Sequence, residues 1–330
     1  MTDMELKVYL CMCVVIHCIL LTSCVREIVL FADSNNIMEF DVDTRNVTVL
    51  FVHTGSEVNA MDYDYRNRYV YFPRYSRHDI MRFKYPSENR ILETVIHTQR
   101  PVCIAIDSVN GHLYWIKYQE DNTLSRSDLD GTNVHVVSTP LRDTFALRLD
   151  LSRRWLYMVD RSSGISKSRY NLSENKTIVN FHPQRVDCID IDVMENKVYW
   201  IDGSGNLTSV KDDGSNVEKI ISTNVSTSYY AISVFGRVIY YAGYNKLFVI
   251  NKTQGSSPIS LYSVSSRIGS IFVFNRSGIL TTMFSDLLLN KFISYIKVKG
   301  KGNVLQLQLS EHFSYDLNYK TNRSRIMLRM

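Results

Sequence analysis

Histidine is the side chain in this sequence best suited to acid–base chemistry near neutral pH, because its imidazole titrates there. His53, His97 and His182 fall at corresponding points of the chain, in predicted connections between strands. This spacing fits an acid-sensitive release switch, for which ordinary loop histidines are the simpler explanation.

Catalytic signatures are missing from the sequence. It contains no G-x-S-x-G nucleophile elbow, no H-E-x-x-H zinc motif, no glycine-rich phosphate loop and no cluster of ligands at metal spacing. We therefore expect no catalytic residue, no metal and no cofactor, and predict that the chain is not an enzyme.

Arginine and tyrosine supply the candidate binding chemistry, since both are enriched at the hot spots of protein interfaces. The predicted ligand-binding residues are Arg74, Tyr75, Arg77, His78, Arg100, Tyr118, Arg142 and Arg161. A merely solvated basic rim would contain the same residues.

A repeat along the chain predicts the scaffold that positions these side chains. Residue pairs that begin with tyrosine recur at intervals of 43, 43, 42 and 41 residues: Tyr71-Phe72, Tyr114-Trp115, Tyr157-Met158, Tyr199-Trp200 and Tyr240-Tyr241. An aspartate stands seven residues before four of these tyrosines, and Ser233 stands there in the last unit. A period of this length is typical of solenoids and propellers.

Each unit contains four short β-rich runs. In one unit the predicted strands are residues 102–107, 112–117, 124–128 and 134–138, with the hairpin signal Asp130-Gly131 before the last. Four strands in about 40–45 residues make a propeller blade, and one blade cannot bury both its faces alone. The predicted fold class is all-β, a β-propeller of blades packed around an axis.

The repeated residues have a structural explanation. A large aromatic ring fills the wedge between blades, and a buried aspartate must accept hydrogen bonds from neighbouring strands. The predicted structural residues are Asp64, Tyr71, Asp107, Tyr114, Trp115, Asp150, Tyr157, Asp160, Asp192, Tyr199, Trp200, Asp202 and Tyr240. Cys103 and Cys188 each lie eleven residues before their unit's tyrosine, and we predict buried free thiols.

The segments IDSVNGHLYWIKYQEDNTLSRSDLDG and IDVMENKVYWIDGSGNLTSVKDDG resemble class B (YWTD) repeats of the low-density lipoprotein receptor family, and VLFADSNNIMEFDVDTRN resembles a first half-blade. The resemblance covers residues 27–280. It implies a six-bladed propeller of four antiparallel strands per blade, closed by a strand near residues 267–275. Pro73-Arg74, Ile116-Lys117 and Ala242-Gly243 depart from the family's Thr-Asp, whereas Asp160 and Asp202 keep the aspartate.

The two ends of the chain differ from the repeat. Lys7 followed by the apolar residues 8–21 and a small-residue site predicts a signal peptide over residues 1–24; a membrane anchor is the alternative. Cleavage would leave only Cys103 and Cys188, and no membrane span. Residues 281–330 form a divergent basic tail in which residues 304–309 could form a strand.

Eight N-x-S/T sequons fit a secreted glycoprotein: Asn46, Asn171, Asn175, Asn206, Asn224, Asn251, Asn275 and Asn322. In a propeller, most of them fall at the face opposite the predicted binding residues. In blades two to four, the face that carries the predicted binding residues is therefore expected to be free for a ligand; we call it the upper face.

Charge argues against nucleic acid as the partner. The chain has 38 Lys and Arg and 33 Asp and Glu, of which eight and three lie beyond residue 280, so the first 280 residues are formally neutral. The resemblance implies an extracellular protein ligand, as in lipoprotein receptor-related proteins and nidogen. Some relatives use an acidic upper face; the basic and aromatic residues here favour an acidic protein or a glycosaminoglycan.

Three functions remain open from the sequence. The favoured one is an extracellular protein-binding module, either secreted or the truncated ectodomain of a receptor. The second is a calcium-dependent propeller hydrolase or lactonase, which would need several converging oxygen ligands. The third is a structural, nidogen-like matrix component.

Overall fold

The computed structural model describes residues 27–52, 55–118, 122–161, 163–180, 185–223, 230–275, 296–301, 304–309 and 313–318. The predicted signal peptide lies outside these residues, as do His53, His182, Asn224 and Asn322. The chain divides into two compact units, Glu27–Phe274 and a second that combines Met1–Arg26 with Asn275–Met330.

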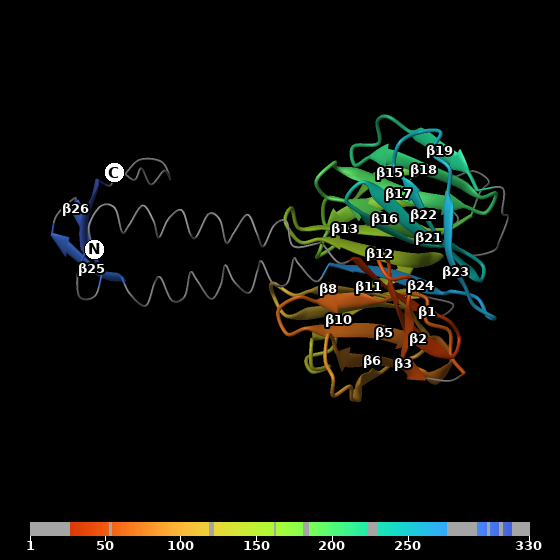
Figure 1. The fold of residues 1–330 in the computed structure, drawn as a ribbon, viewed down its shortest axis with the longest axis horizontal. Coiled ribbons are helices and arrows are strands. Elements are labelled where there is room, and N and C mark those ends of the chain that lie inside the picture. The colour runs from red at the N-terminus through yellow and green to blue at the C-terminus, as the bar shows by residue number, and fades with distance from the viewer. Residues whose placement is uncertain are drawn as a thin grey trace. The chain divides into compact units, whose positions relative to one another are not determined.

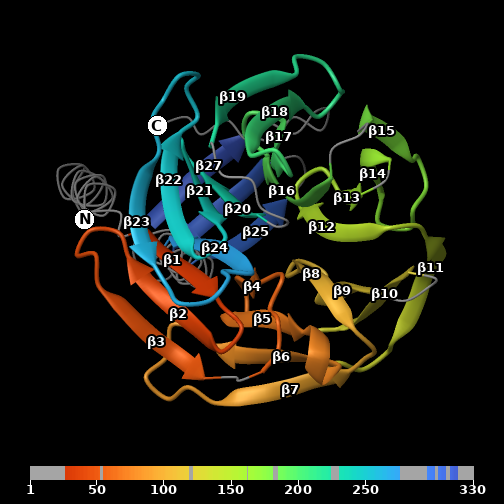
Figure 2. The same ribbon diagram turned by 90° about the vertical axis from the view of Figure 1, so that its right-hand side faces the viewer.

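The first unit is a six-bladed β-propeller, as predicted, with four antiparallel strands in each blade (Figure 1). Figure 2 looks along its axis and shows one strand of each blade at the centre. From the centre outward, blade 1 is β24 (Ser270–Asn275), β1 (Glu27–Ala32), β2 (Asn36–Asp41) and β3 (Val47–Val52); blade 2 is β4 (Asp62–Asp64), β5 (Tyr69–Arg74), β6 (Asp79–Lys84) and β7 (Leu92–His97); blade 3 is β8 (Pro101–Asp107), β9 (His112–Lys117), β10 (Asn122–Asp128) and β11 (His135–Leu141). Blade 4 is β12 (Thr144–Asp150), β13 (Trp155–Asp160), β14 (Gly164–Arg169) and β15 (Lys176–Asn180); blade 5 is β16 (Val186–Asp192), β17 (Lys197–Asp202), β18 (Asn206–Lys211) and β19 (Glu218–Ser222); blade 6 is β20 (Tyr230–Phe235), β21 (Val238–Gly243), β22 (Lys246–Asn251) and β23 (Ile259–Ser263).

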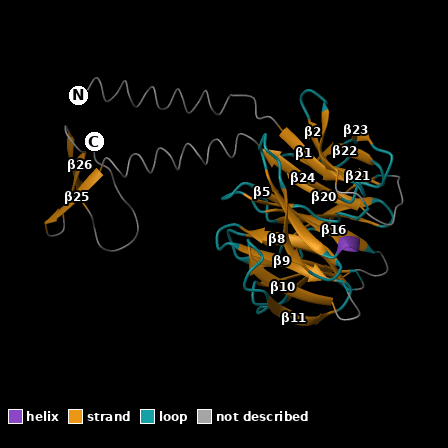
Figure 3. Cartoon of the chain, turned by 90° about the horizontal axis from the view of Figure 1, so that it is seen from below, coloured by secondary structure: helices purple, strands orange, loops and turns teal. Residues whose placement is uncertain are grey.

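Blade 1 combines the two ends of the propeller sequence. β24 forms its inner strand and hydrogen-bonds to β1, which confirms the predicted closing strand near residues 267–275. In the part of the chain that the structure describes, the one helical element is η1 (Tyr75–Arg77), a single 3-10 turn between β5 and β6 (Figure 3).

The core lies in the contacts between blades and follows from the repeat. One aliphatic residue near the start of the third strand is fully buried in every blade: Ile37, Ile80, Leu124, Ile165, Leu207 and Leu247. The repeat tyrosines Tyr71, Tyr157, Tyr199 and Tyr240 are at most 1% exposed. Alternation along the strands puts these side chains into the space between adjacent sheets.

Pairing in blade 6 corrects the sequence alignment of Ser233. Counting back from tyrosine placed Ser233 with Asp64 and Asp192, but it pairs with Tyr240. In blades 2 and 5 the residues that pair with the repeat tyrosine are Asp62 and Asp190. The reason is a shorter turn in blade 6, where Phe235 pairs directly with Val238.

The Asp130-Gly131 hairpin signal marks a close approach between blades. Gly131 has φ +88°, and a Cβ atom there would lie 2.1 Å from the carbonyl oxygen of Val95 on β7. Gly214 repeats this in blade 5 against Ile178 of β15. Only glycine combines this backbone conformation with so close a neighbouring backbone.

The second unit contains a three-stranded antiparallel sheet of β25 (Ile296–Lys301), β26 (Val304–Leu309) and β27 (Phe313–Asn318). The strand expected at residues 304–309 is confirmed as β26, the central strand. Among the described residues, no helix is both long and apolar enough to cross a membrane.

Candidate functional site

Two sets of connections meet on one face of the propeller, the upper face. One set joins the second and third strands of a blade, and the other joins successive blades. The amide of Tyr75 donates a hydrogen bond to the carbonyl of Glu57 at 3.2 Å, and that of Tyr118 donates to the carbonyl of Arg100 at 3.0 Å. The predicted ligand-binding residues all belong to these connections or to the strand ends beside them.

Arg74 and Arg161 are engaged inside the propeller. The Arg74 guanidinium binds both carboxylate oxygens of Asp79, with Nε to Oδ1 at 2.8 Å, and its side chain is 16% exposed. Arg161 is 8% exposed; its Nε lies 2.5 Å from Asp187, and its guanidinium carbon lies 3.3 Å from the ring centre of Phe145. Burial lowers the pKa of Arg161, and Asp187 opposes this. Both arginines therefore hold the upper connections in place.

Arg77, Arg100 and Arg142 are exposed on the upper face. Arg185, which sequence reasoning missed, joins them from the connection between blades 4 and 5, with a side chain that is 54% exposed and an ion pair to Asp187 at 2.9 Å. Its position could have indicated this, because Arg185, like Arg100 and Arg142, lies in a connection between successive blades. Glu120 and Asp121 belong to the connection after β9 and lie outside the described residues.

The other three predicted residues support this arginine patch. Tyr75 and Tyr118 are half-buried, and Tyr118 packs edge-on against Phe145 with ring centres 5.9 Å apart. Nδ1 of His78 accepts the backbone N–H of Arg100 at 3.1 Å. This bond fixes the backbone that presents Arg100.

Repeat tyrosines of several blades contact the next blade at the lower face. The Tyr71 hydroxyl donates to the carbonyl of Leu129 in blade 3 at 3.0 Å, and Tyr114 packs edge-on against Tyr170 of blade 4 at 5.7 Å. The Tyr240 hydroxyl donates to Glu27 of blade 1. Burial of the side chain raises the pKa of Tyr71 to about 12.

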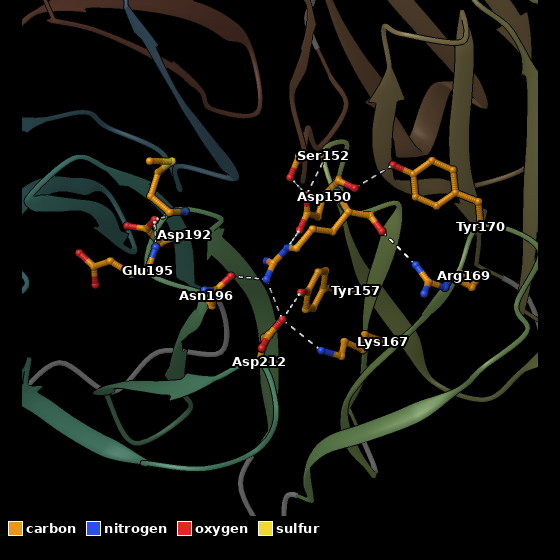
Figure 4. Close-up of polar contacts among 12 residues, drawn as sticks. Asp150, Ser152, Tyr157, Lys167, Arg169, Tyr170, Asp192, Glu195, Asn196 and Asp212 are labelled. Carbon is orange, nitrogen blue, oxygen red and sulfur yellow. Dashed lines mark hydrogen bonds and ion pairs between the residues drawn. The ribbon is translucent and has the colours of Figure 1, made fainter. Parts of the chain in front are cut away.

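Blades 4 and 5 share a polar network around Asp212, shown in Figure 4. Oδ2 of Asp212 accepts from Lys167 at 3.1 Å, from Arg153 at 3.1 Å and from the Tyr157 hydroxyl at 3.3 Å. Arg153 also binds Asp150 with Nε at 2.5 Å. Five polar groups satisfy one another here, so the network is a structural joint of the propeller.

The repeat aspartates cap the turns that follow them. Asp64 and Asp107 are fully buried; Oδ1 of Asp64 accepts the amide of Arg66 at 3.0 Å, and Asp107 accepts that of Asn110 at 3.1 Å. Asp192 also forms an ion pair with Lys252 of blade 6. Asp160 and Asp202 cap turns of the upper face in the same way, by accepting the amides of Ser163 and Ser204.

The predicted tryptophans are buried, and Trp115 Nε1 donates to Thr98 at 3.1 Å.

The described sequons differ in how free their asparagine is. The side chains of Asn46, Asn171, Asn175 and Asn251 are exposed. Asn206 is not free, since its Nδ2 donates to both carboxylate oxygens of Asp202, at 3.2 and 3.0 Å. Asn275 ends β24, and its side chain is outside the described atoms.

Charged residues also meet at the propeller axis, and sequence reasoning missed this cluster. Arg148 on β12 donates from Nε to Oδ1 of Asp190 on β16 at 3.0 Å. Asp190 accepts the amide of Val234 in blade 6 at 2.7 Å, and Asp62 of blade 2 accepts the amide of Ile106 in blade 3 at 2.7 Å. These bonds join the inner strands of blades 4, 5 and 6 to one another, and the inner strand of blade 2 to that of blade 3.

Burial perturbs this axial cluster. Desolvation raises the pKa of Asp62 to about 6, opposed by the Ile106 hydrogen bond and by Arg148. Burial alone would lower the pKa of Arg148, but the attraction of the Asp190 carboxylate outweighs this and the pKa is raised. Cys103 and Cys188 are buried free thiols on inner strands β8 and β16, and burial raises the pKa of Cys103 to about 12. These thiols are therefore protonated at neutral pH.

Metal ligands do not gather in the described part of the chain, where no group of three or more His, Cys, Asp and Glu side chains could hold an ion.

Comparison with known proteins gives the fold a relative. No family model matches the chain. A chain from the crystal structure of a nidogen/laminin complex matches with a TM-score of 0.66 and 16% sequence identity, over 75% of this chain and 98% of that one. At this identity the likeness concerns the fold, and it supports the YWTD resemblance at that level: the chain shares its six-bladed propeller architecture with a protein of the nidogen/laminin complex.

Proposed function

We propose that this chain is an extracellular protein-binding module whose upper face binds an acidic segment of its partner. The observation that carries the proposal is the division among the upper-face arginines. Arg77, Arg100, Arg142 and Arg185 are exposed, whereas Arg74 and Arg161 are held inside. The exposed four come from connections of successive blades, so they form one patch beside the half-buried Tyr75 and Tyr118.

Arginine suits an acidic partner because its guanidinium binds carboxylates with two parallel hydrogen bonds. The scaffold beneath the patch is rigid, since the backbone of each connection is bonded to its neighbour. Binding by such a patch should depend strongly on salt, because exposed charges steer association and are screened by ions.

An extracellular location is part of the proposal. It is supported by the signal-peptide pattern of residues 1–24, by the exposed sequons and by the fold shared with a chain of the nidogen/laminin complex. A binding role is proposed because exposed arginines from successive connections lie on the upper face, and arginine is enriched at the hot spots of protein interfaces.

The test is affinity capture from conditioned medium and matrix extract, with the secreted full chain as bait and mass spectrometry as readout. The bait R77E/R100E/R142E should lose the specific partners. R45E, which reverses an exposed arginine of the lower face, should keep them. Equal capture by all three baits would refute the upper-face site.

Purified partners then separate the remaining classes. A partner whose binding survives removal of glycosaminoglycan chains is the acidic protein proposed here; one released by that treatment shows a glycosaminoglycan ligand instead. Hydrolase and lactonase assays with added Ca²⁺ test the enzymatic alternative, and insolubility with basement membrane would show a structural matrix role.

A further inference from the structure

The six outer strands of the propeller differ in how their open edges are protected. An unpaired strand edge is a template for pairing with another chain, and proteins block it with charged residues or proline. β7 carries Glu93, β11 carries Pro140, β15 carries Lys176 and β19 carries Glu218 and Lys219.

β3 of blade 1 has no such protection. Its sequence, VTVLFV, contains neither a charged residue nor proline, and β3 pairs only with β2 in its sheet. Val49 and Val52 are 51% and 64% exposed, although they belong to a strand of high β propensity. By its residues alone this edge should promote self-association.

A sequon stands at the start of this strand. Asn46 directly precedes Val47, and the sequon threonine, Thr48, is on the strand and exposed. The backbone carbonyl of Asn46 is fixed by the amide of Asp41 at 3.0 Å, while its exposed side-chain amide has no hydrogen bond within the described residues. This contrasts with Asn206, whose amide is held by Asp202.

The same coincidence occurs in the adjacent blade. β23, with the sequence ISLYS, also lacks a charged residue and proline, and Ile259 is 56% exposed. Asn251 is the last residue of β22, the strand that pairs with β23. Both unprotected edges therefore have an exposed sequon at one end.

We propose that an N-linked oligosaccharide on Asn46 covers the uncharged edge of β3 and keeps the propeller monomeric. A six-residue strand is about 20 Å long, comparable with the span of a branched oligosaccharide, and such groups are bulky and solubilising. The inference rests on the secretory location within the proposed function, but not on ligand binding.

The modification is a transfer from a lipid-linked oligosaccharide diphosphate. The bond from sugar C1 to the diphosphate oxygen breaks, and a bond from C1 to Nδ2 of Asn46 forms. The amide loses one proton and the lipid diphosphate leaves, so nothing is oxidised or reduced.

The experiment expresses the full chain in cultured animal cells and measures the occupancy of each sequon by mass spectrometry, and oligomeric state by size exclusion with light scattering. The wild type should have Asn46 occupied and be a monomer. N46Q and T48A should raise the oligomer-to-monomer ratio roughly tenfold. N175Q is the matched control, because its sequon adjoins β15, which Lys176 protects; it should stay monomeric.

A rescue variant separates edge pairing from misfolding. In N46Q/V49K a lysine replaces an exposed valine of the edge, and the monomer should return. An empty Asn46 beside other occupied sequons would overturn the inference, as would a monomeric N46Q or oligomers that V49K does not reverse. If no sequon is occupied, the extracellular location fails as well; a loss of partner capture with Asn46 occupied concerns the proposed function alone.

Discussion

Nε of Arg148 lies 3.0 Å from Oδ1 of Asp190, and this ion pair joins blades 4 and 5 at the propeller axis. Both side chains are largely buried, at 18% and 15% exposure. A buried pair is costly to break from one side, because the charge that remains has no partner.

The variant R148M should therefore destabilise the propeller by about 2–3 kcal/mol, toward the lower end for buried pairs because both groups retain some solvent contact. Urea unfolding measures the change. R185M removes an ion pair whose arginine is 54% exposed, and should cost less than about 1 kcal/mol. R148M/D190N should recover part of the loss, since it removes the stranded charge; equal stability of R148M and R185M would show that the axial pair is not important.

Asp62 should make stability fall as pH rises. Burial raises its pKa to about 6 in the folded protein from 3.8, so the folded state binds the proton more tightly than the unfolded chain. The stabilisation from this group is complete below about pH 4 and is lost between about pH 4 and pH 6.

Two pKa units correspond to about 3 kcal/mol, and partial solvent contact reduces this to about 1–2 kcal/mol. The variant D62N should remove this part of the pH dependence, measured as the difference in unfolding free energy between pH 4 and pH 7. D43N, at an exposed lower-face position, should leave the profile unchanged. Parallel profiles for wild type and D62N would contradict the assignment.

Much of the fold could be predicted from the sequence because the propeller repeats one local pattern. The tyrosine spacing, the Asp-Gly turn and the aliphatic residue of the third strand each recur, because every blade packs against the next in a similar way. The alignment of Ser233 was the exception. The shorter β20–β21 turn moved the register by two residues, and a count from one anchor cannot detect such a change.

The upper-face residues were harder to predict because exposure depends on partners distant in the sequence. Arg161 is paired with Asp187 of the next blade, and Arg185 is exposed in a connection that the predicted set did not include. For Arg74 the partner is close in the sequence, since Asp79 stands five residues later. Asp79 binds Arg74 across the turn between β5 and β6, as Asn206 binds Asp202 in blade 5. The axial cluster had a signal that the sequence analysis did not use: Asp62, Arg148 and Asp190 each stand nine residues before the repeat tyrosine of their unit and pair with it.

Gly131 and Gly111 form a natural comparison between a crowded and an open glycine. Both have positive φ, +88° and +74°, but a Cβ at Gly131 would lie 2.1 Å from the Val95 carbonyl, whereas a Cβ at Gly111 would meet no atom within 4 Å. G111A should cost about 1 kcal/mol for the backbone conformation alone. G131A should cost about 3 kcal/mol or more, because the contact between blades 2 and 3 must open. Thermal unfolding of the two variants measures the difference, and equal losses would show that the blades are not packed this closely.

Arg161 and Arg142 should separate stability from binding. Arg161 is 8% exposed, lies over the Phe145 ring and pairs with Asp187, so R161L removes a packed cation and leaves Asp187 with only the exposed Arg185. We expect a loss of about 2–3 kcal/mol in urea unfolding. Arg142 is exposed, and R142L should change stability by less than about 0.5 kcal/mol while weakening capture of the upper-face partner. The division requires Arg161 to affect the free energy of unfolding and Arg142 to affect partner capture. An R161L variant as stable as wild type, or an R142L variant that captures the partner as well as wild type, would therefore show that the division is wrong.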